Sequence, residues 1–114
     1  MELEKAYKTI KAEGAEVIAI SVDNMSDTKL MADLVSASYP VLSDEAHVVT
    51  EKYGLFNLLG DGVSAPGTYV ITSDKRIRLG HVGQSIGDRV STRAIINGIR
   101  ELKGKSPLPD GKPL

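Results

Sequence analysis

The stretch EVIAISVD, residues 16–23, decides the fold class. It is a continuous apolar run rich in β-branched residues, which is typical of a strand that is covered on both faces in a parallel sheet. Leu3, Tyr7 and Ile10 precede it with the spacing of one helical face, and Gly14 follows where a helix ends, so we expect an amphipathic helix over residues 2–13. A helix that leads into such a strand indicates an α/β fold.

The rest of the chain continues this alternation. Ser26 and Asp27 are expected to cap a second helix, and a third is expected to begin at residues 43–45 and to end at Gly54. Two strand-like runs with a short polar turn between them predict an antiparallel hairpin, and Ser91 is expected to cap the last helix. The remaining predicted segments are an apolar face formed by Leu30, Met31, Leu34 and Val35, a short extended piece over 39–42, a loop over 56–67, strands over 67–72 and 77–82, and a helix over 91–103. Helices and strands in this order predict an α/β sandwich with a mixed sheet.

Length and composition limit the class of protein. The chain has 114 residues, 41% of them hydrophobic, with a net charge of -1 from 14 basic and 15 acidic residues. This suits one soluble domain over residues 1–104, followed by an extended tail over 105–114, and it disfavours nucleic acid as a partner. No signal peptide or membrane span is visible. The absence of cysteine excludes a disulfide scaffold, a thiolate zinc site and a cysteine nucleophile within this chain.

Several candidate sites have a simpler local interpretation. The glycine-rich segment over residues 60–62 lacks the spacing of a phosphate-binding loop, so a plain loop is favoured. Asp23 and Asp44 resemble the metal-binding carboxylates of phospho-acceptor domains, yet each has a turn or helix-start role available, which we favour. His47 and His81 show no metal-ligand spacing, so structural roles are expected for both.

The loop around Pro66 carries the most information. Proline directly precedes a predicted strand in the run VSAPGTYVI, and X-Pro bonds are the ones that adopt the cis form at low cost. An ordinary proline at the start of a strand and a specially shaped cis turn both remain open at this stage.

Four ordered motifs together resemble the redoxin branch of the thioredoxin superfamily, which comprises the peroxiredoxins (alkyl hydroperoxide reductase/thiol-specific antioxidant) and the TlpA/ResA-like thiol-disulfide proteins. The motifs are EVIAISVD over 16–23, DEAHVVTEKYGL over 44–55, APGTYVIT over 65–72 followed by a charged hairpin and GHVG, and IGDRVS over 86–91. The resemblance spans about residues 2–103. It implies a thioredoxin-like fold with a four- or five-stranded mixed sheet flanked by helices.

The same resemblance implies a missing N-terminal segment. In such proteins the helix that matches residues 2–13 follows a strand and a loop that carries the reactive cysteine. Here that helix has no capping residue and the chain has no cysteine, so we expect the sequence to begin just after the catalytic segment. The absent strand would lie between those matching 17–22 and 68–72. Three outcomes are open: direct pairing of these strands, a strand borrowed from a second copy, or a marginally folded chain.

Site residues are implied at the Pro66 loop. Pro66 matches the cis-proline of thioredoxin-like members, where typical peroxiredoxins have an arginine, and this favours the disulfide-exchange or hybrid branch. Thr68 and Tyr69 match the residues that follow that proline. The implied substrate-binding residues are Ala65, Pro66 and Thr68. The turn over residues 73–76 has no glycine and so departs from the family's usual hairpin.

We therefore expect the C-terminal portion of a thiol-dependent antioxidant oxidoreductase. Its intact parent would reduce peroxides or exchange protein disulfides, and this chain alone would be inactive. No catalytic residue, metal or cofactor is expected within it, and the partners foreseen are a second copy by strand exchange, with no nucleic acid and no membrane. The compartment is not determined, and cytoplasmic is the default. The alternatives are a cysteine-free binding module that uses the Pro66 loop, and a receiver-like domain that uses Asp23 and Asp44.

Overall fold

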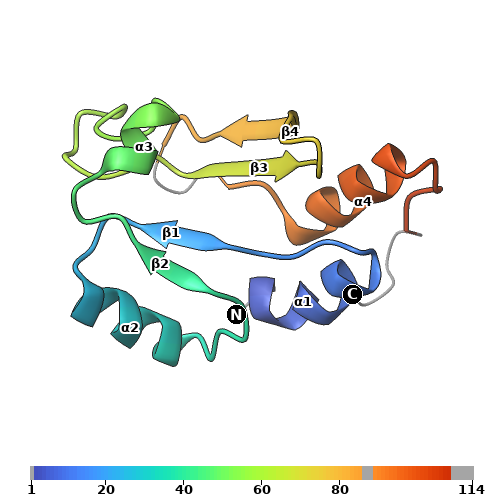
Figure 1. Cartoon of the computed structure of the whole chain (residues 1–114), viewed down its shortest axis with the longest axis horizontal. Coiled ribbons are helices and arrows are strands. Elements are labelled where there is room, and N and C mark those ends of the chain that lie inside the picture. The colour runs from blue at the N-terminus through green and yellow to red at the C-terminus, as the bar shows by residue number, and fades with distance from the viewer. Residues whose placement is uncertain (1, 86–88, 109–114) are drawn as a thin grey trace.

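The computed structural model describes residues 2–85 and 89–108 (Figure 1). Helices and strands alternate along the chain, as expected. The elements are α1 (Glu2–Ala12), β1 (Ala19–Ser21), α2 (Met25–Leu34), β2 (Val41–Ser43), α3 (Val48–Lys52), β3 (Gly67–Ile71), β4 (Ile77–Val82) and α4 (Thr92–Leu102). The IGDRVS motif lies partly outside the described residues. No helix among those described has the length and apolar character needed to cross a bilayer.

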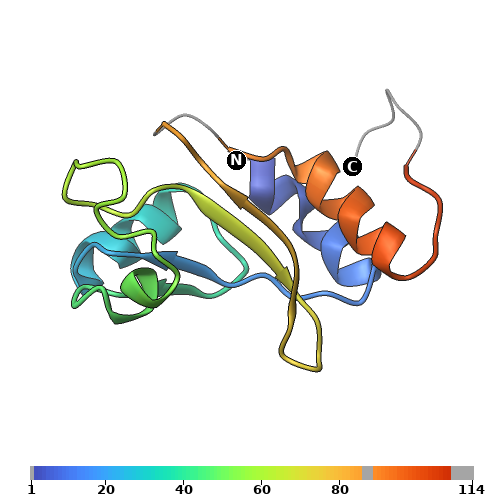
Figure 2. The ribbon, with the colours of Figure 1, turned by 90° about the horizontal axis from the view of Figure 1, so that it is seen from above.

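The strands form two separate sheets, where the resemblance implied one sheet of four or five strands. β1 pairs with β2 in parallel, with Ile20 opposite Leu42, and β3 pairs with β4 in antiparallel register, with Thr68 opposite His81. β1 and β3 run next to each other in opposite directions (Figures 1 and 2). No ladder joins them in the described part of the chain, so of the three outcomes left open, direct pairing of these two strands is the one that the structure does not have.

Both half-sheets pack against one core. It is a cluster of buried residues from α1 and α4, namely Ala6, Ile10, Ile96 and Ile99. Val17, just before β1, and Val70 of β3 both pack against this cluster, so each half-sheet is attached to the same pair of helices. Strands hydrogen-bond at a spacing of about 4.8 Å, and no ladder joins β1 to β3 within residues 2–85 and 89–108.

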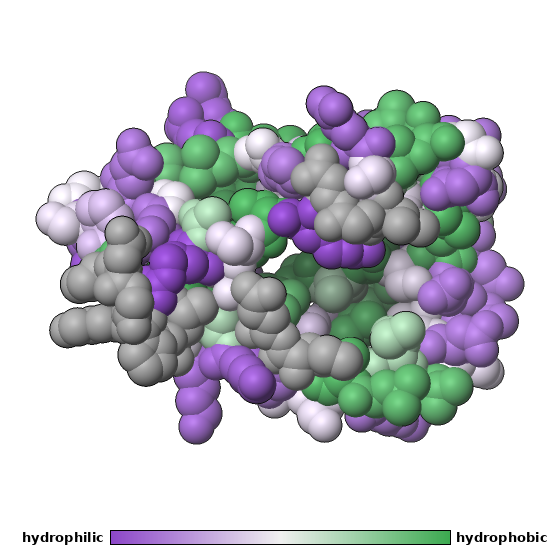
Figure 3. All heavy atoms as spheres, turned by 180° about the vertical axis from the view of Figure 1, so that it is seen from behind, coloured by the Kyte–Doolittle hydropathy of each residue, from purple (hydrophilic) through white to green (hydrophobic). Residues whose placement is uncertain are grey.

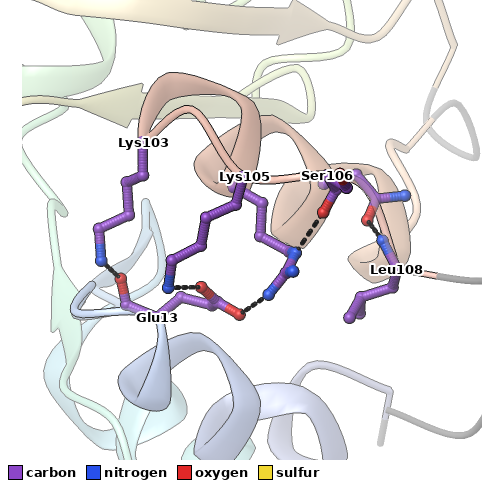
Figure 4. Close-up of polar contacts among 7 residues, drawn as sticks. Glu13, Lys103, Lys105, Ser106 and Leu108 are labelled. Carbon is purple, nitrogen blue, oxygen red and sulfur yellow. Dashed lines mark hydrogen bonds and ion pairs between the residues drawn. The ribbon is translucent and has the colours of Figure 1, made fainter.

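A buried carboxylate joins the ends of α1 and α4 (Figure 4). Glu13 is only 7% exposed, and its Oε2 accepts a hydrogen bond from Arg100 Nη1 at 2.6 Å. Lys105 Nζ lies 3.2 Å from Glu13 Oε1, and Lys103 Nζ donates to the Glu13 carbonyl oxygen. The Arg100 guanidinium holds the pKa of the Glu13 carboxyl below its usual range, and Lys105 adds to this effect.

The beginning of the predicted tail is packed against α4. Arg100 Nε donates to Ser106 O at 2.7 Å, and Leu108 N donates to Asn97 Oδ1 at 2.8 Å. Leu108 also packs against the core cluster. These contacts hold residues 105–108 on the helix, while residues 109–114 of the predicted tail lie outside the described residues. The division into a domain over 1–104 and a tail over 105–114 stays a prediction.

Two predicted elements differ in position. β1 is only three residues long, shorter than the apolar run 16–23, because only Ala19–Ser21 have a partner strand. α2 is capped by Asn24, whose Oδ1 accepts from Asp27 N at 2.8 Å, ahead of the expected Ser26 and Asp27. An Asn at this position satisfies a free N–H of the first turn, so the helix begins earlier.

The predicted apolar face of α2 is largely uncovered. Leu30 and Leu34 are 59% and 70% exposed, and Thr28 is the buried residue of this helix. Thr28 Oγ1 donates to Asp23 O at 3.3 Å, which binds the first turn of the helix to the end of β1. The helix therefore turns Thr28 inward, and the leucines two and six residues further on face outward.

Candidate functional site at the Pro66 loop

The backbone at Pro66 is fixed from both sides. Ala65 N donates to Leu55 O at 2.9 Å, and Gly83 N donates to Pro66 O at 2.7 Å. An isolated bridge pairs Phe56 with Ser64 at the mouth of the loop. Ala65 and Pro66 are both buried, with Ala65 only 3% exposed. Hydrogen bonds to neighbouring chain segments therefore hold these two residues in place.

The Ala65–Pro66 peptide bond is trans, because no cis bond occurs among the described residues. Of the two readings left open for this proline, the structure has the ordinary proline at the start of a strand. Gly67, the next residue, begins β3 against the buried Leu55. A Cβ at Gly67 would lie 2.6 Å from Leu55 Cδ1, which explains the small residue there.

Thr68 lies on a different part of the site from Ala65 and Pro66. It lines a cavity of about 190 Å³ between the β3–β4 hairpin and α4. The walls are mainly apolar, and Thr68 and His81 bring polar groups. The lining residues are Thr68, Val70, Leu79, Gly80, His81, Val90, Ala94 and Ile95. The structure thus places one of the three expected substrate-binding residues, Thr68, at a cavity, and the other two, Ala65 and Pro66, in a buried loop that does not line it.

His81 was not among the expected binding residues. It stands directly opposite Thr68 in the antiparallel register, so both side chains lie on the same face of the hairpin. The hairpin pattern in the sequence was a sufficient signal for the two strands. The turn has no family glycine, however, and the register that brings Thr68 and His81 together depends on the turn geometry.

His47 makes structural contacts, as expected. The His47 ring stacks on Phe56 with centroids 3.8 Å apart and planes 11° from parallel. His47 Nδ1 lies 3.1 Å from Glu51 Oε1, one helical turn along α3. Tyr53 and Tyr69 make a further ring contact at 5.0 Å, between the end of α3 and β3. These contacts attach the 44–55 motif to the Pro66 loop.

Asp44 caps α3, as its local interpretation predicted. Its two carboxylate oxygens accept from the backbone N–H groups of Val48 and Val49 and from both the N–H and the hydroxyl of Thr50. The Thr50 N–H bond is the main cause that lowers the pKa of Asp44. α3 itself begins at Val48, with His47 at the N-cap position, and not at residues 43–45.

Asp23 also has its predicted role in a turn. It accepts from Ser21 Oγ at 2.9 Å, just after β1. No group of three or more metal-binding side chains occurs within residues 2–85 and 89–108, so a receiver-like metal site gains no support there. The two aspartates have the structural roles that we favoured for them.

Comparison with known proteins decides the family. The model of the AhpC/TSA family matches residues 1–79. The chain belongs to the AhpC/TSA family. The chloroplastic peroxiredoxin Q of Suaeda salsa is 34% identical over 74 residues, and that of Arabidopsis thaliana is 32% identical over 74 residues. Each match covers 65% of this chain, and 35% and 34% of the respective relatives, so the chain spans about a third of their length.

Solved structures of AhpC share the fold of this AhpC/TSA chain. Enterococcus faecalis AhpC superposes with a TM-score of 0.80 at 15% identity, over 95% of this chain and 69% of that one. Mycobacterium bovis AhpC gives a TM-score of 0.74 at 15% identity, over 98% of this chain and 65% of that one. The predicted thioredoxin-like fold is confirmed, as is the resemblance to peroxiredoxins.

Proposed function

We propose that this chain is the C-terminal part of a thiol-dependent peroxidase or disulfide oxidoreductase, and that by itself it carries out no thiol chemistry. The observation that carries the proposal is the absence of any cysteine from an AhpC/TSA-family chain. Two facts support it: the chain spans about a third of its curated relatives, and its sheet is divided into two unjoined halves.

The chemistry of peroxide reduction indicates where the cysteine of the intact protein would lie. A thiolate attacks one peroxide oxygen, the O–O bond breaks, the sulfur becomes a sulfenate, and the departing oxygen takes a proton and leaves as alcohol or water. A helix N-terminus stabilises such a thiolate through its free N–H groups and dipole. We place the cysteine of the intact protein at the N-terminal end of α1. Ala65, Pro66 and Thr68 are then the residues that contact the substrate beside this cysteine.

The choice between peroxide and disulfide as substrate depends on Pro66. A proline offers neither a charge nor a hydrogen-bond donor to a peroxide oxygen. The peptide bond before Pro66 is trans, and the Pro66 carbonyl already accepts a hydrogen bond from Gly83, so it is not free to pair with a peptide substrate. The loop therefore favours neither substrate, and both remain in the proposal.

Turnover assays of the purified 114-residue chain test the proposal. We expect no consumption of hydrogen peroxide with dithiothreitol as reductant, and no reduction of insulin disulfides. A rate above that of buffer in either assay would contradict it. The control is an intact AhpC assayed in parallel, which must be active under the same conditions.

A second candidate is a cysteine-free module that binds through the Pro66 loop, and the same lack of cysteine favours it. Reading the gene upstream of the Met1 codon separates the two. An in-frame segment that encodes a strand and a cysteine-containing loop supports the oxidoreductase, whereas a stop codon with a genuine start at Met1 supports the binding module.

A further inference from the structure

Residues 105–108, which we call the strap, lie against α4 after that helix has ended. Lys105 and Pro107 of the strap line an open groove of about 690 Å³ together with residues of β4 and α4. Leu108 packs against the α1–α4 core, and its N–H donates to Asn97 Oδ1 at 2.8 Å. If the strap left α4, the groove would lose part of its wall and apolar surface of the core would be uncovered.

The Arg100 guanidinium binds the end of α1 and the strap at the same time (Figure 4). Its Nη1 donates to Glu13 Oε2 at 2.6 Å, and its Nε donates to Ser106 O at 2.7 Å. A guanidinium is planar and presents its N–H groups in a fixed fork, so the orientation that reaches Glu13 also directs Nε to the strap. A change at Glu13 therefore affects the bond to Ser106.

Glu13 balances three cations that come from α4 and the residues after it. Arg100 and Lys105 pair with the Glu13 carboxylate, and Lys103 Nζ donates to the Glu13 carbonyl oxygen. These three cations lie around one carboxylate, so they would repel each other if Glu13 lost its charge. The charge of Glu13 thus holds the cluster together.

Burial makes this charge important. The side chains of Glu13 and Arg100 are 9% and 22% exposed. A largely buried guanidinium that loses its carboxylate partner is unfavourable, so Arg100 would turn toward water and give up its bond to Ser106. Water is close, because hydrophilic side chains lie at the end of the molecule that carries α4 (Figure 3). Lys105 would lose its partner at the same time, so two side-chain contacts of the strap depend on one charge.

We propose that Glu13 is a charge-dependent latch: its ionised carboxylate holds the strap on α4, and neutralising it releases residues 106–108 while α1 and α4 stay folded. The hinge follows Lys105, whose N–H donates to Arg100 O at 2.8 Å and so stays with the end of the helix. This goes beyond the proposed function, because the latch requires neither a cysteine nor a substrate.

Acid is the signal that opens the latch. The hydrogen bond from Arg100 is the main cause that holds the pKa of Glu13 below its ordinary value of 4.5. The latch is therefore closed above pH 4.5 and opens as the pH falls through the lower pKa that Glu13 has in the folded chain. Arginine and lysine side chains keep their charge at these pH values, so Glu13 is the member of the cluster that changes.

Amide hydrogen exchange of the variant Glu13→Gln, followed by NMR at neutral pH, tests the latch. We expect the protection factor of Leu108 to fall about tenfold or more relative to the unmodified chain. The protection factors of Ile96 and Ile99 in α4 should fall by a clearly smaller factor, because the helix stays folded. Equal losses at the three residues, an unchanged Leu108, or an unprotected Leu108 in the unmodified chain would overturn the proposal.

Glu16→Gln is the matched control. The Glu16 carboxylate also binds a cation, with Lys11 Nζ at 3.7 Å, and it accepts from the Tyr7 hydroxyl at 2.6 Å; both partners belong to α1. This variant should leave the protection factor of Leu108 unchanged. A fall as large as that in the first variant would show that a general loss of stability frees the strap, and the latch would be refuted.

A pH titration of the unmodified chain makes the test independent of whether the variant folds. Protection of Leu108 should be lost as Glu13 is protonated, which the carbon-13 shift of its carboxyl group reports, and before protection of Ile99 is lost. The proposal is wrong if Leu108 and Ile99 lose protection together, or if Leu108 stays protected after Glu13 has been protonated.

Discussion

Gly67 lies where the candidate site meets a buried leucine. Its backbone is outside the left-handed region, so alanine is tolerated by the chain conformation and only the contact with Leu55 opposes it. We expect Gly67→Ala to lower the free energy of unfolding by about 1–2 kcal/mol through overpacking, measured by urea denaturation.

A double-mutant cycle tests the cause of that loss. In the Leu55→Ala background the added methyl group has space, so Gly67→Ala should cost clearly less there than in the unmodified chain. Equal costs in both backgrounds would show that the contact with Leu55 is not responsible.

The hydrogen bond of Tyr7 makes the stability depend on pH in the alkaline range. Its hydroxyl donates to Glu16 Oε1 at 2.6 Å, and this bond is the main cause that raises the pKa of Tyr7 to about 12. Since the pKa is higher in the folded chain than the ordinary 10.0, the bond stabilises the fold fully below pH 10 and is lost as the pH rises toward 12. The phenolate absorbance of the unmodified chain should contain a late-titrating component that Tyr7→Phe lacks, and an unchanged titration curve would contradict this assignment.

α4 depends on one side-chain cap. Ser91 Oγ accepts from Ala94 N at 3.1 Å, and this helix carries Ile96 and Ile99 of the core. Ser91→Ala should lower the free energy of unfolding by about 1 kcal/mol, measured by thermal or urea unfolding. Ser91→Asp retains an acceptor and should cost much less. If both variants lose the same amount, the cap is not what stabilises the helix start.

The helices and strands show which structural features a local sequence pattern can predict. The helix over 2–13, the hairpin and the last helix were all predicted, because side-chain period and turn residues act within a few positions. The predicted start of α2 was wrong by a few residues, because Asn24 caps the helix ahead of Ser26. The exposure of Leu30 and Leu34 could not be predicted, because a helical face shows which residues lie together and not whether a neighbour covers them.

Acid should weaken the whole molecule. The pKa values of Glu13, Glu16, Asp44 and Asp74 are all lower in the folded chain than their ordinary values, which are 4.5 for Glu and 3.8 for Asp. Each ionised carboxylate therefore contributes stability above its ordinary pKa, and this contribution is lost as the pH falls through the folded value. The melting temperature should be level above about pH 5 and should fall progressively below about pH 4.5.

Glu13→Gln tests how much the ion pairs of Glu13 with Arg100 and Lys105 contribute to this pH dependence. At neutral pH the variant should melt a few degrees lower, because Arg100 and Lys105 lose their partner. The difference from the unmodified chain should shrink as the pH falls below the ordinary pKa of 4.5 and through the lower pKa that Glu13 has in the folded chain, where its carboxylate becomes protonated. Glu101→Gln, an exposed change on α4, serves as the control. A difference that stays constant with pH would refute the role of the Glu13 charge.

The sequence by itself determined the α/β class, the redoxin resemblance and the structural roles of Asp23 and Asp44, since periodic patterns, caps and family motifs are local. Only the tertiary structure decided that the sheet is divided, that the Ala65–Pro66 bond is trans, and that Thr68 shares a cavity with His81. The physical reason is that strand pairing depends on where the α1–α4 core holds each half-sheet. The packing of Val17 and Val70 on this core and the contact of Glu13 with Arg100 between its two helices all join residues far apart in the chain.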